Sequence, residues 1–88
     1  MYYVYVIVSV SADKMYIGYT ADLDKRIKAH NEDDKGATSG KYWELVYYEA
    51  FKNKADAYDR EQKLKDHGQA KRWLLHRIRR SLPEEYSN

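Results

Sequence analysis

The sequence predicts an α+β fold, in which a small three-stranded, mainly antiparallel sheet is flanked by helices in the order β-β-α-β-α-α. Two observations carry this prediction. Three short segments are rich in β-branched and aromatic residues, and the segments after them place apolar residues at helical spacing. Because the chain has 88 residues, we expect one domain over residues 1–82, followed by a flexible tail at 83–88.

The strands are expected at residues 2–10, 15–20 and 43–51. Residues 2–10 (YYVYVIVSV) form an apolar run typical of a strand buried on both faces. The turn-forming residues 11–14 (SADK) indicate that the second strand returns beside the first as a hairpin. A polar stretch with two glycines, residues 31–42, predicts a loop before the third strand.

The first helix is expected over residues 22–30. Leu23 and Ile27 are four residues apart and share one face of this helix. Thr20 or Asp22 can cap its start, because a short polar side chain there accepts a hydrogen bond from a backbone N–H of the first turn.

Two further helices are expected after the third strand. Asn53 can cap a helix that runs to about residue 67, with Gly68 as its stop. The last helix is expected over residues 69–81. Its predicted apolar face consists of Ala70, Trp73, Leu74 and Ile78.

The composition excludes several classes of protein. The chain has no cysteine, which rules out a disulfide scaffold, a zinc site with cysteine ligands and a cysteine nucleophile, and fits the cytoplasm. Residues 2–10 are too few to span a bilayer, and they lack the features of a signal peptide, so no membrane partner is expected. P-loop, GxGxxG, HExxH and GxSxG motifs are absent, which argues against the phosphate-binding, dinucleotide, zinc and serine-nucleophile sites that they mark. No organic cofactor is expected.

The positive charge is concentrated near the C-terminus. The net charge is only +2, but residues 69–80 hold five Lys or Arg residues and no acid. Such a segment can face the phosphates of a nucleic acid, although a solvated helix face is an alternative. The residues expected to contact nucleic acid are Lys71, Arg72, Arg79 and Arg80.

Glu61 interrupts an apolar stripe. It shares a helix face with Ala57 and Leu64, at spacings of four and three residues. A carboxylate on an inward face must be neutralised, paired or bound to a metal. The pattern therefore leaves two interpretations open, a metal ligand and a structural ion pair with a nearby arginine.

Two further groups are candidates for chemistry. Arg26 and His30 are four residues apart on one helix face, as are members of a solvent-exposed charge ladder. Tyr3 and Tyr5 share one face of the first strand, and Tyr16 lies near the start of its expected partner. These tyrosines fit either a site or ordinary aromatic pairing across strands.

At this point the chain resembles the GIY-YIG nucleases. Tyr3-Val4-Tyr5, ten residues, and then Tyr16-Ile17-Gly18 is similar to the signature that names the family. The resemblance extends over residues 2–80, nearly the whole chain. It includes the spacing from Leu23 to Arg26 and His30, the third strand, and the pair Arg60-Glu61. The chain looks most like small stand-alone proteins of the UPF0213 type, which are similar to the N-terminal nuclease domain of the excision-repair excinuclease.

The resemblance implies hydrolysis of phosphodiester bonds with one divalent cation, Mg²⁺ or Mn²⁺. Glu61 would be the sole protein ligand of this ion, with water and phosphate as the others. Arg26 would hold the scissile phosphate and offset its charge in the transition state.

The resemblance also implies a role for the aromatic residues. Tyr5 would take a proton from the attacking water, and Tyr16 would position that water. His30 would help Tyr5, because histidine titrates near physiological pH, whereas a phenol does not. Gly18 would let the backbone approach its neighbours closely.

Three positions depart from the pattern of the family. Tyr3 replaces a glycine, Tyr19 stands where the repair nucleases have a lysine, and Trp73 lies where many members carry an asparagine near the site. We therefore expect a DNA endonuclease of weak or specialised activity in DNA repair or processing. A nucleic-acid-binding module without catalysis is the alternative. The DNA form, single-stranded or branched, and a monomer or a dimer stay open.

Overall fold

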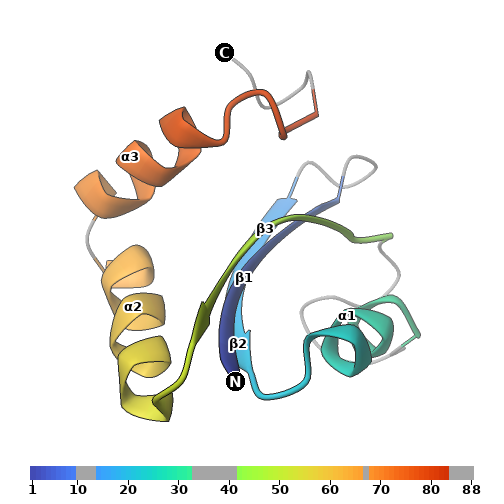
Figure 1. Cartoon of the computed structure of the whole chain (residues 1–88). Coiled ribbons are helices and arrows are strands. Elements are labelled where there is room, and N and C mark those ends of the chain that lie inside the picture. Colours follow the sequence, from blue (N-terminus) through green and yellow to red (C-terminus); the bar gives the residue numbers. More distant parts are fainter. Residues whose placement is uncertain (10–13, 33–41, 67, 84–88) are drawn as a thin grey trace.

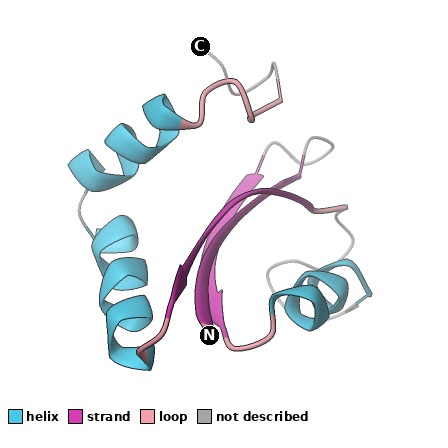
Figure 2. Cartoon of the chain, viewed as in Figure 1, coloured by secondary structure: helices cyan, strands magenta, loops and turns pink. Residues whose placement is uncertain are grey.

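A computed structural model describes residues 1–9, 14–32, 42–66 and 68–83. Its elements follow the predicted α+β order β-β-α-β-α-α, and the sheet lies between helices on both sides (Figures 1 and 2). The elements are β1 (Tyr2–Ser9), β2 (Lys14–Thr20), α1 (Leu23–Glu32), β3 (Glu44–Phe51), α2 (Lys54–Asp66) and α3 (Gly68–Arg77).

The first strand is the centre of the sheet. The strand order is β2-β1-β3, and β1 pairs in antiparallel fashion with both neighbours. Because both faces and both edges of β1 are covered, Val4, Ile7 and the residues around them have no exposed surface. This confirms the prediction of a strand buried on both faces.

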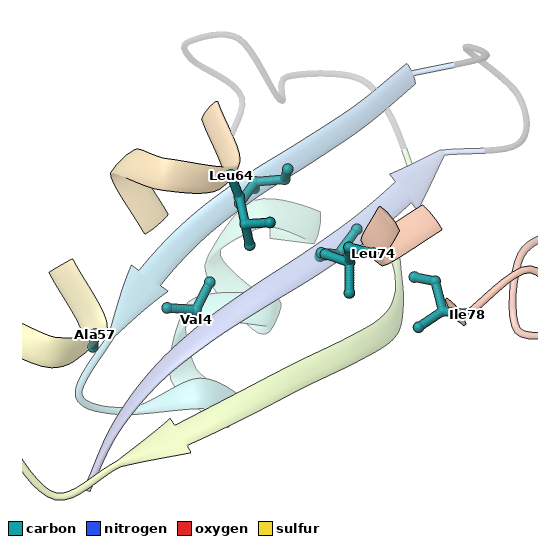
Figure 3. Packing of buried hydrophobic residues seen from close by; sticks show 7 residues of the cluster. Val4, Ala57, Leu64, Leu74 and Ile78 are labelled. Carbon is teal, nitrogen blue, oxygen red and sulfur yellow. The ribbon is translucent and has the colours of Figure 1, made fainter. Parts of the chain in front are cut away.

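Alternation along β1 divides the core into two layers. Val4 and Val6 face α2 and α3 and pack in one cluster with Ala57, Leu64 and other residues of these helices (Figure 3). Tyr5 and Ile7 point to the opposite face, which α1 covers (Figure 1). Their cluster includes Trp43, Leu23 and Ile27.

The ends of the helices differ from the expectation. Gly68, expected to stop α2, is the first residue of α3, and α3 ends at Arg77 rather than at residue 81. Beyond Arg77 the chain continues in tighter turns, in which Ser81 N–H donates to the carbonyl of Ile78 at 2.8 Å. At the first helix, α1 runs on to Glu32.

The expected place of Trp73 on the apolar face of α3 is wrong. Leu74 and Ile78, four residues apart, form one buried row against the sheet. Trp73 lies beside this row and is 66% exposed. The indole instead lines an open pocket together with Ala70, Leu74 and Arg77.

Some predictions fall outside the described residues. These are most of the turn at 11–14, the loop over 33–41 and the tail at 84–88. The domain boundary at residue 82 stays a prediction. No helix in the described part of the chain is long and apolar enough to cross a membrane.

Candidate active site

The hydroxyl of Tyr5 is the centre of a buried polar cluster. The ring of Tyr5 has no exposed surface, and its hydroxyl lies 2.8 Å from Nε2 of His30. Nε of Arg26 donates to the same hydroxyl at 3.4 Å. Arg26 and His30 thus both reach the Tyr5 hydroxyl from one face of α1, where His30 is buried and Arg26 keeps an exposed surface.

The first turn of α1 sets the direction of this helix. The carboxylate of Asp22 accepts a hydrogen bond from the backbone N–H of Lys25 at 3.1 Å, as an N-cap does. With the helix start fixed, the spacing of four residues brings Arg26 and His30 to the same side, above Tyr5.

Gly18 makes room for the two tyrosine rings. It pairs with Tyr5 in the register of β1 and β2. A Cβ atom at position 18 would lie 2.6 Å from the Tyr5 hydroxyl oxygen and 2.9 Å from Cε1 of Tyr16. Only a residue without a side chain can therefore occupy this position while both rings keep their places.

Aromatic rings enclose His30. Its ring centroid lies 4.8 Å from that of Tyr16 and 6.3 Å from that of Trp43. The side chain of Asn31 holds the backbone of Trp43 through two hydrogen bonds, of 2.6 and 3.1 Å. Sequence reasoning did not identify Trp43 or Asn31, and the one available signal was an aromatic residue at the start of the third strand.

Glu61 is buried on α2, as the interrupted stripe suggests, with 6% of its surface exposed. One carboxylate oxygen accepts a hydrogen bond from the Gln62 amide at 2.8 Å. The other lies 3.2 Å from Nζ of Lys65, and this ammonium lies 5.6 Å from the centroid of the Tyr16 ring. Through Lys65 the carboxylate is therefore close to the Tyr5–Tyr16 cluster.

The ion pair of Glu61 is made with a lysine on its own helix. The sequence contained this signal, because Glu61 and Lys65 have the Glu-to-Lys spacing of four residues that pairs on helices. The structure is compatible with Glu61 as a metal ligand and as a member of a structural ion pair. Its carboxylate has an ionic partner, Lys65, and the side chain of this partner is 41% exposed.

The electrostatics of the cluster keep Tyr5 protonated. Burial raises the pKa of Tyr5, the hydrogen bond and charge of Arg26 oppose this rise, and the carboxylate of Glu61 adds to it. The hydrogen bond to Tyr5 in turn raises the pKa of Arg26, which stays charged. Because Arg26 can only donate, the Tyr5 hydroxyl can donate its own proton to Nε2 of His30 in the tautomer that leaves Nε2 unprotonated.

The acidic residues fit one kind of metal site only. Within the described ranges no group of three or more His, Asp or Glu side chains could hold a metal ion. The buried carboxylate of Glu61 is a hard oxygen donor. It suits an ion such as Mg²⁺ that keeps most of its ligands as water and phosphate oxygens.

The basic residues of the C-terminal segment lie elsewhere. α3 packs on the side of the sheet opposite α1 (Figure 1), so its cations are not brought to the Tyr5 hydroxyl. Of the predicted nucleic-acid contacts, α3 carries Lys71 and Arg72, whereas Arg79 and Arg80 follow its end at Arg77. Their role stays a prediction.

Comparison with known proteins agrees with this arrangement. Residues 1–73 match the model of the GIY-YIG catalytic domain. The UPF0213 protein YazA of Bacillus subtilis is 35% identical over 83 residues, which are 91% of this chain and 83% of YazA. The UPF0213 protein HQ_3675A of Haloquadratum walsbyi is 34% identical over 76 residues, 84% of each chain.

A solved structure is similar along the full chain. The solution NMR structure of the UPF0213 protein BH0048 from Bacillus halodurans has a TM-score of 0.55 and 30% sequence identity, and the match covers 100% of this chain and 95% of that one. The resemblance found in the sequence is thereby confirmed. The chain belongs to the GIY-YIG catalytic domain family, among its UPF0213 members.

Proposed function

We propose that this protein is a metal-dependent DNA endonuclease that hydrolyses phosphodiester bonds with a tyrosine-activated water. The observation that carries the proposal is the hydroxyl of Tyr5, which is held between His30 Nε2 and the Arg26 guanidinium. A general base, an orienting partner and a phosphate-binding cation thus meet at one oxygen atom. Membership of the GIY-YIG catalytic domain family supports a nuclease and a nucleic-acid substrate.

The proton of the attacking water leaves through Tyr5 and His30. The water oxygen forms the new bond to phosphorus as its proton passes to the Tyr5 oxygen, while Tyr5 gives its own proton to His30 Nε2. This relay suits a phenol with a raised pKa, because no free phenolate has to exist beforehand. The bond from phosphorus to the leaving oxygen breaks, and solvent supplies the proton for that oxygen.

Arg26 binds the phosphate. Its Nε–H is used by Tyr5, so the terminal N–H groups of this exposed side chain remain to donate to the non-bridging phosphate oxygens. The same hydrogen bond fixes the guanidinium relative to the base. The two groups therefore keep one distance from each other as the substrate binds.

Glu61 would hold the divalent cation, which when bound supplies positive charge at the leaving oxygen. The carboxylate is buried, and Gln62 fixes one of its oxygens. Lys65 balances the charge of the other oxygen and is exposed enough to move aside. Mg²⁺ and Mn²⁺ both suit a single carboxylate ligand of this kind.

Incubation with labelled DNA tests the proposal. Single-stranded, duplex and branched substrates are each combined with the protein in Mg²⁺, in Mn²⁺ and in EDTA. Cleavage of at least one form is expected in a divalent cation and not in EDTA. Binding to these substrates without cleavage of any of them would contradict the proposal and would support a binding module without catalysis.

Replacing Tyr5 by phenylalanine is expected to slow cleavage about 10²- to 10⁴-fold, because the proton acceptor is lost. Tyr3→Phe is the matched control, since Tyr3 lies on the same face of β1 and packs on Tyr48. Its rate should stay near that of the wild type.

The pH profile separates the relay from a free phenolate. With His30 as the final acceptor no phenolate has to form first, so the wild-type rate is not expected to follow the ionisation of a tyrosine, whose ordinary pKa is 10.0. If the rate instead continued to rise through pH 10.0 and beyond, Tyr5 would accept the proton as a free phenolate without His30, because the pKa of Tyr5 is raised above its ordinary value.

A further inference from the structure

A pocket is lined by residues of β3, α2 and α3. Figure 1 shows that α2 and α3 lie on the side of the sheet opposite α1, which covers Tyr5. The volume of the pocket is about 450 Å³, within the range of small-ligand sites. Ala70 and Leu74 give it an apolar surface. The polar and aromatic residues that line it are Tyr47, Glu49, Arg60, Lys63, Trp73 and Arg77.

The polar side chains Tyr47, Glu49 and Arg60 of this pocket bind one another. Nε of Arg60 donates to Glu49 Oε2 at 2.9 Å, and Nη2 of Arg60 lies 2.9 Å from the same oxygen. The Tyr47 hydroxyl donates to Glu49 at 2.6 Å. Burial, with the hydrogen bond and charge of Glu49, raises the pKa of Tyr47 to about 12, so it remains a donor. Glu49 and Arg60 therefore cancel each other's charge.

The rim of the pocket is cationic and aromatic. Lys63 and Arg77 are exposed and form no ion pair with any residue that the structure describes. Since Glu49 and Arg60 compensate each other, these two side chains leave the pocket positive. Trp73 adds an indole that is 66% exposed beside them.

This combination favours one class of ligand. A planar ring stacks on an exposed indole, and a phosphate pairs with lysine and arginine, and an unpaired nucleotide carries both groups. A carboxylate or a phosphate alone would leave the indole unused. An apolar peptide would leave both cations without partners.

We propose that this pocket binds an unpaired nucleotide of a nucleic-acid strand, with its base on Trp73 and its phosphate between Lys63 and Arg77. The identity of the ligand rests on the proposed function. The molecule measures 33 × 30 × 20 Å, and the sheet separates the pocket from Tyr5. The bound nucleotide is therefore not the one at the scissile bond but one several positions away, in a single-stranded flank of the substrate.

The two tryptophans make binding visible without turnover. Trp43 is 3% exposed, whereas Trp73 is 66% exposed, so a stacked base quenches mainly Trp73. A short oligothymidylate is titrated into the whole protein in EDTA, and tryptophan fluorescence and the anisotropy of a labelled oligonucleotide are followed. Quenching is expected, and Trp73→Ala should weaken binding about 5- to 100-fold, the usual effect of losing one stacked base.

Matched variants distinguish binding in the pocket from nonspecific electrostatic binding to the protein surface. Arg77→Ala should weaken binding more than Lys54→Ala, because Lys54 is an exposed cation of α2 outside the pocket. Tyr58→Ala removes another exposed aromatic residue, 47% exposed and outside the pocket, and should leave the quenching unchanged. Equal losses for Lys54→Ala and Arg77→Ala would overturn the proposal.

Three further outcomes are decisive. If deoxythymidine monophosphate quenches Trp73 at the same concentrations as the oligonucleotide, the assignment to a strand is wrong. Since these titrations contain EDTA, they do not depend on cleavage. Quenching of Trp73 in a protein that cleaves no substrate would contradict the nuclease and support the pocket. Normal cleavage with unaltered binding by Trp73→Ala would overturn the pocket alone.

Discussion

Glu61→Gln is expected to abolish metal-dependent cleavage while the protein stays folded. The amide has nearly the shape of the carboxylate and can still accept a hydrogen bond from Gln62, but it lacks the charge that holds a divalent cation. The lost partner, Lys65, is 41% exposed and can return to water, so the cost in stability is small. Cleavage is measured in Mg²⁺, and thermal unfolding is measured with and without Mg²⁺.

Lys65→Met is the comparison that separates a metal ligand from a structural ion pair. It removes the other member of the same pair and leaves the carboxylate buried without this cation. If Glu61 binds metal, Mg²⁺ should stabilise Lys65→Met at lower concentrations than the wild type, because no ammonium competes for the carboxylate. It should not stabilise Glu61→Gln. Equal stabilisation of Glu61→Gln and the wild type by Mg²⁺ would leave the ion pair as the whole role of Glu61.

Gly18→Ala is expected to disable the site and to destabilise the fold together. The new Cβ would lie 2.6 Å from the Tyr5 hydroxyl oxygen and 2.8 Å from Cζ of Tyr5. Tyr5 cannot retreat, because its ring is fully buried and its hydroxyl bonds to His30. Overpacking of this kind costs about 1–3 kcal/mol. Equilibrium unfolding in urea measures the loss, and the same preparation should show cleavage at background level.

Gly68→Ala is the matched control for this variant. A Cβ at position 68 has no neighbour within 4 Å, and Gly68 is the first residue of α3. Alanine favours a helix by up to about 1 kcal/mol over glycine, so this variant should be as stable as the wild type or more stable. If Gly18→Ala unfolded at the same urea concentration as Gly68→Ala, close packing at position 18 would not be the reason for its glycine.

The order of the elements was predictable because local signals agreed with one another. The apolar run of β1 has the length and composition of a central strand. The side chain of Asn53 accepts a hydrogen bond from the backbone N–H of Ala55 at 2.8 Å at the start of α2, as predicted for a cap. Such signals depend on residues close in sequence, so they can be recognised without knowledge of the tertiary structure.

The candidate site was predictable only in part. Alternation places Tyr5 on one face of its strand, and helical spacing places Arg26 and His30 on one face of theirs. That these two faces meet depends on how α1 packs against the sheet, across 21 and 25 residues of sequence. The family resemblance supplied that step. No sequence pattern predicted the contact between Asn31 and Trp43, because their two hydrogen bonds form only when the folded chain brings them together.

Trp73 shows where pattern reasoning fails. Helical spacing is compatible with Trp73 on the apolar face of α3. The sequence does not reveal which side chains of that face contact the sheet. Leu74 of α3 and Ile78, which follows α3, are buried against the core, whereas Trp73 is 66% exposed.

The central position of β1 also determines how the site responds to local fluctuations. Tyr5 belongs to a strand that is hydrogen-bonded along both edges and covered on both faces. Strands of this kind exchange their amide hydrogens only when the molecule opens globally. The phenol that is proposed to accept the proton is thus placed by the last segment to unfold, and no closing lid is needed to form it. Changes in α3, on the other side of the sheet, can then alter substrate binding without moving α1, whose Arg26 and His30 hold the reactive hydroxyl.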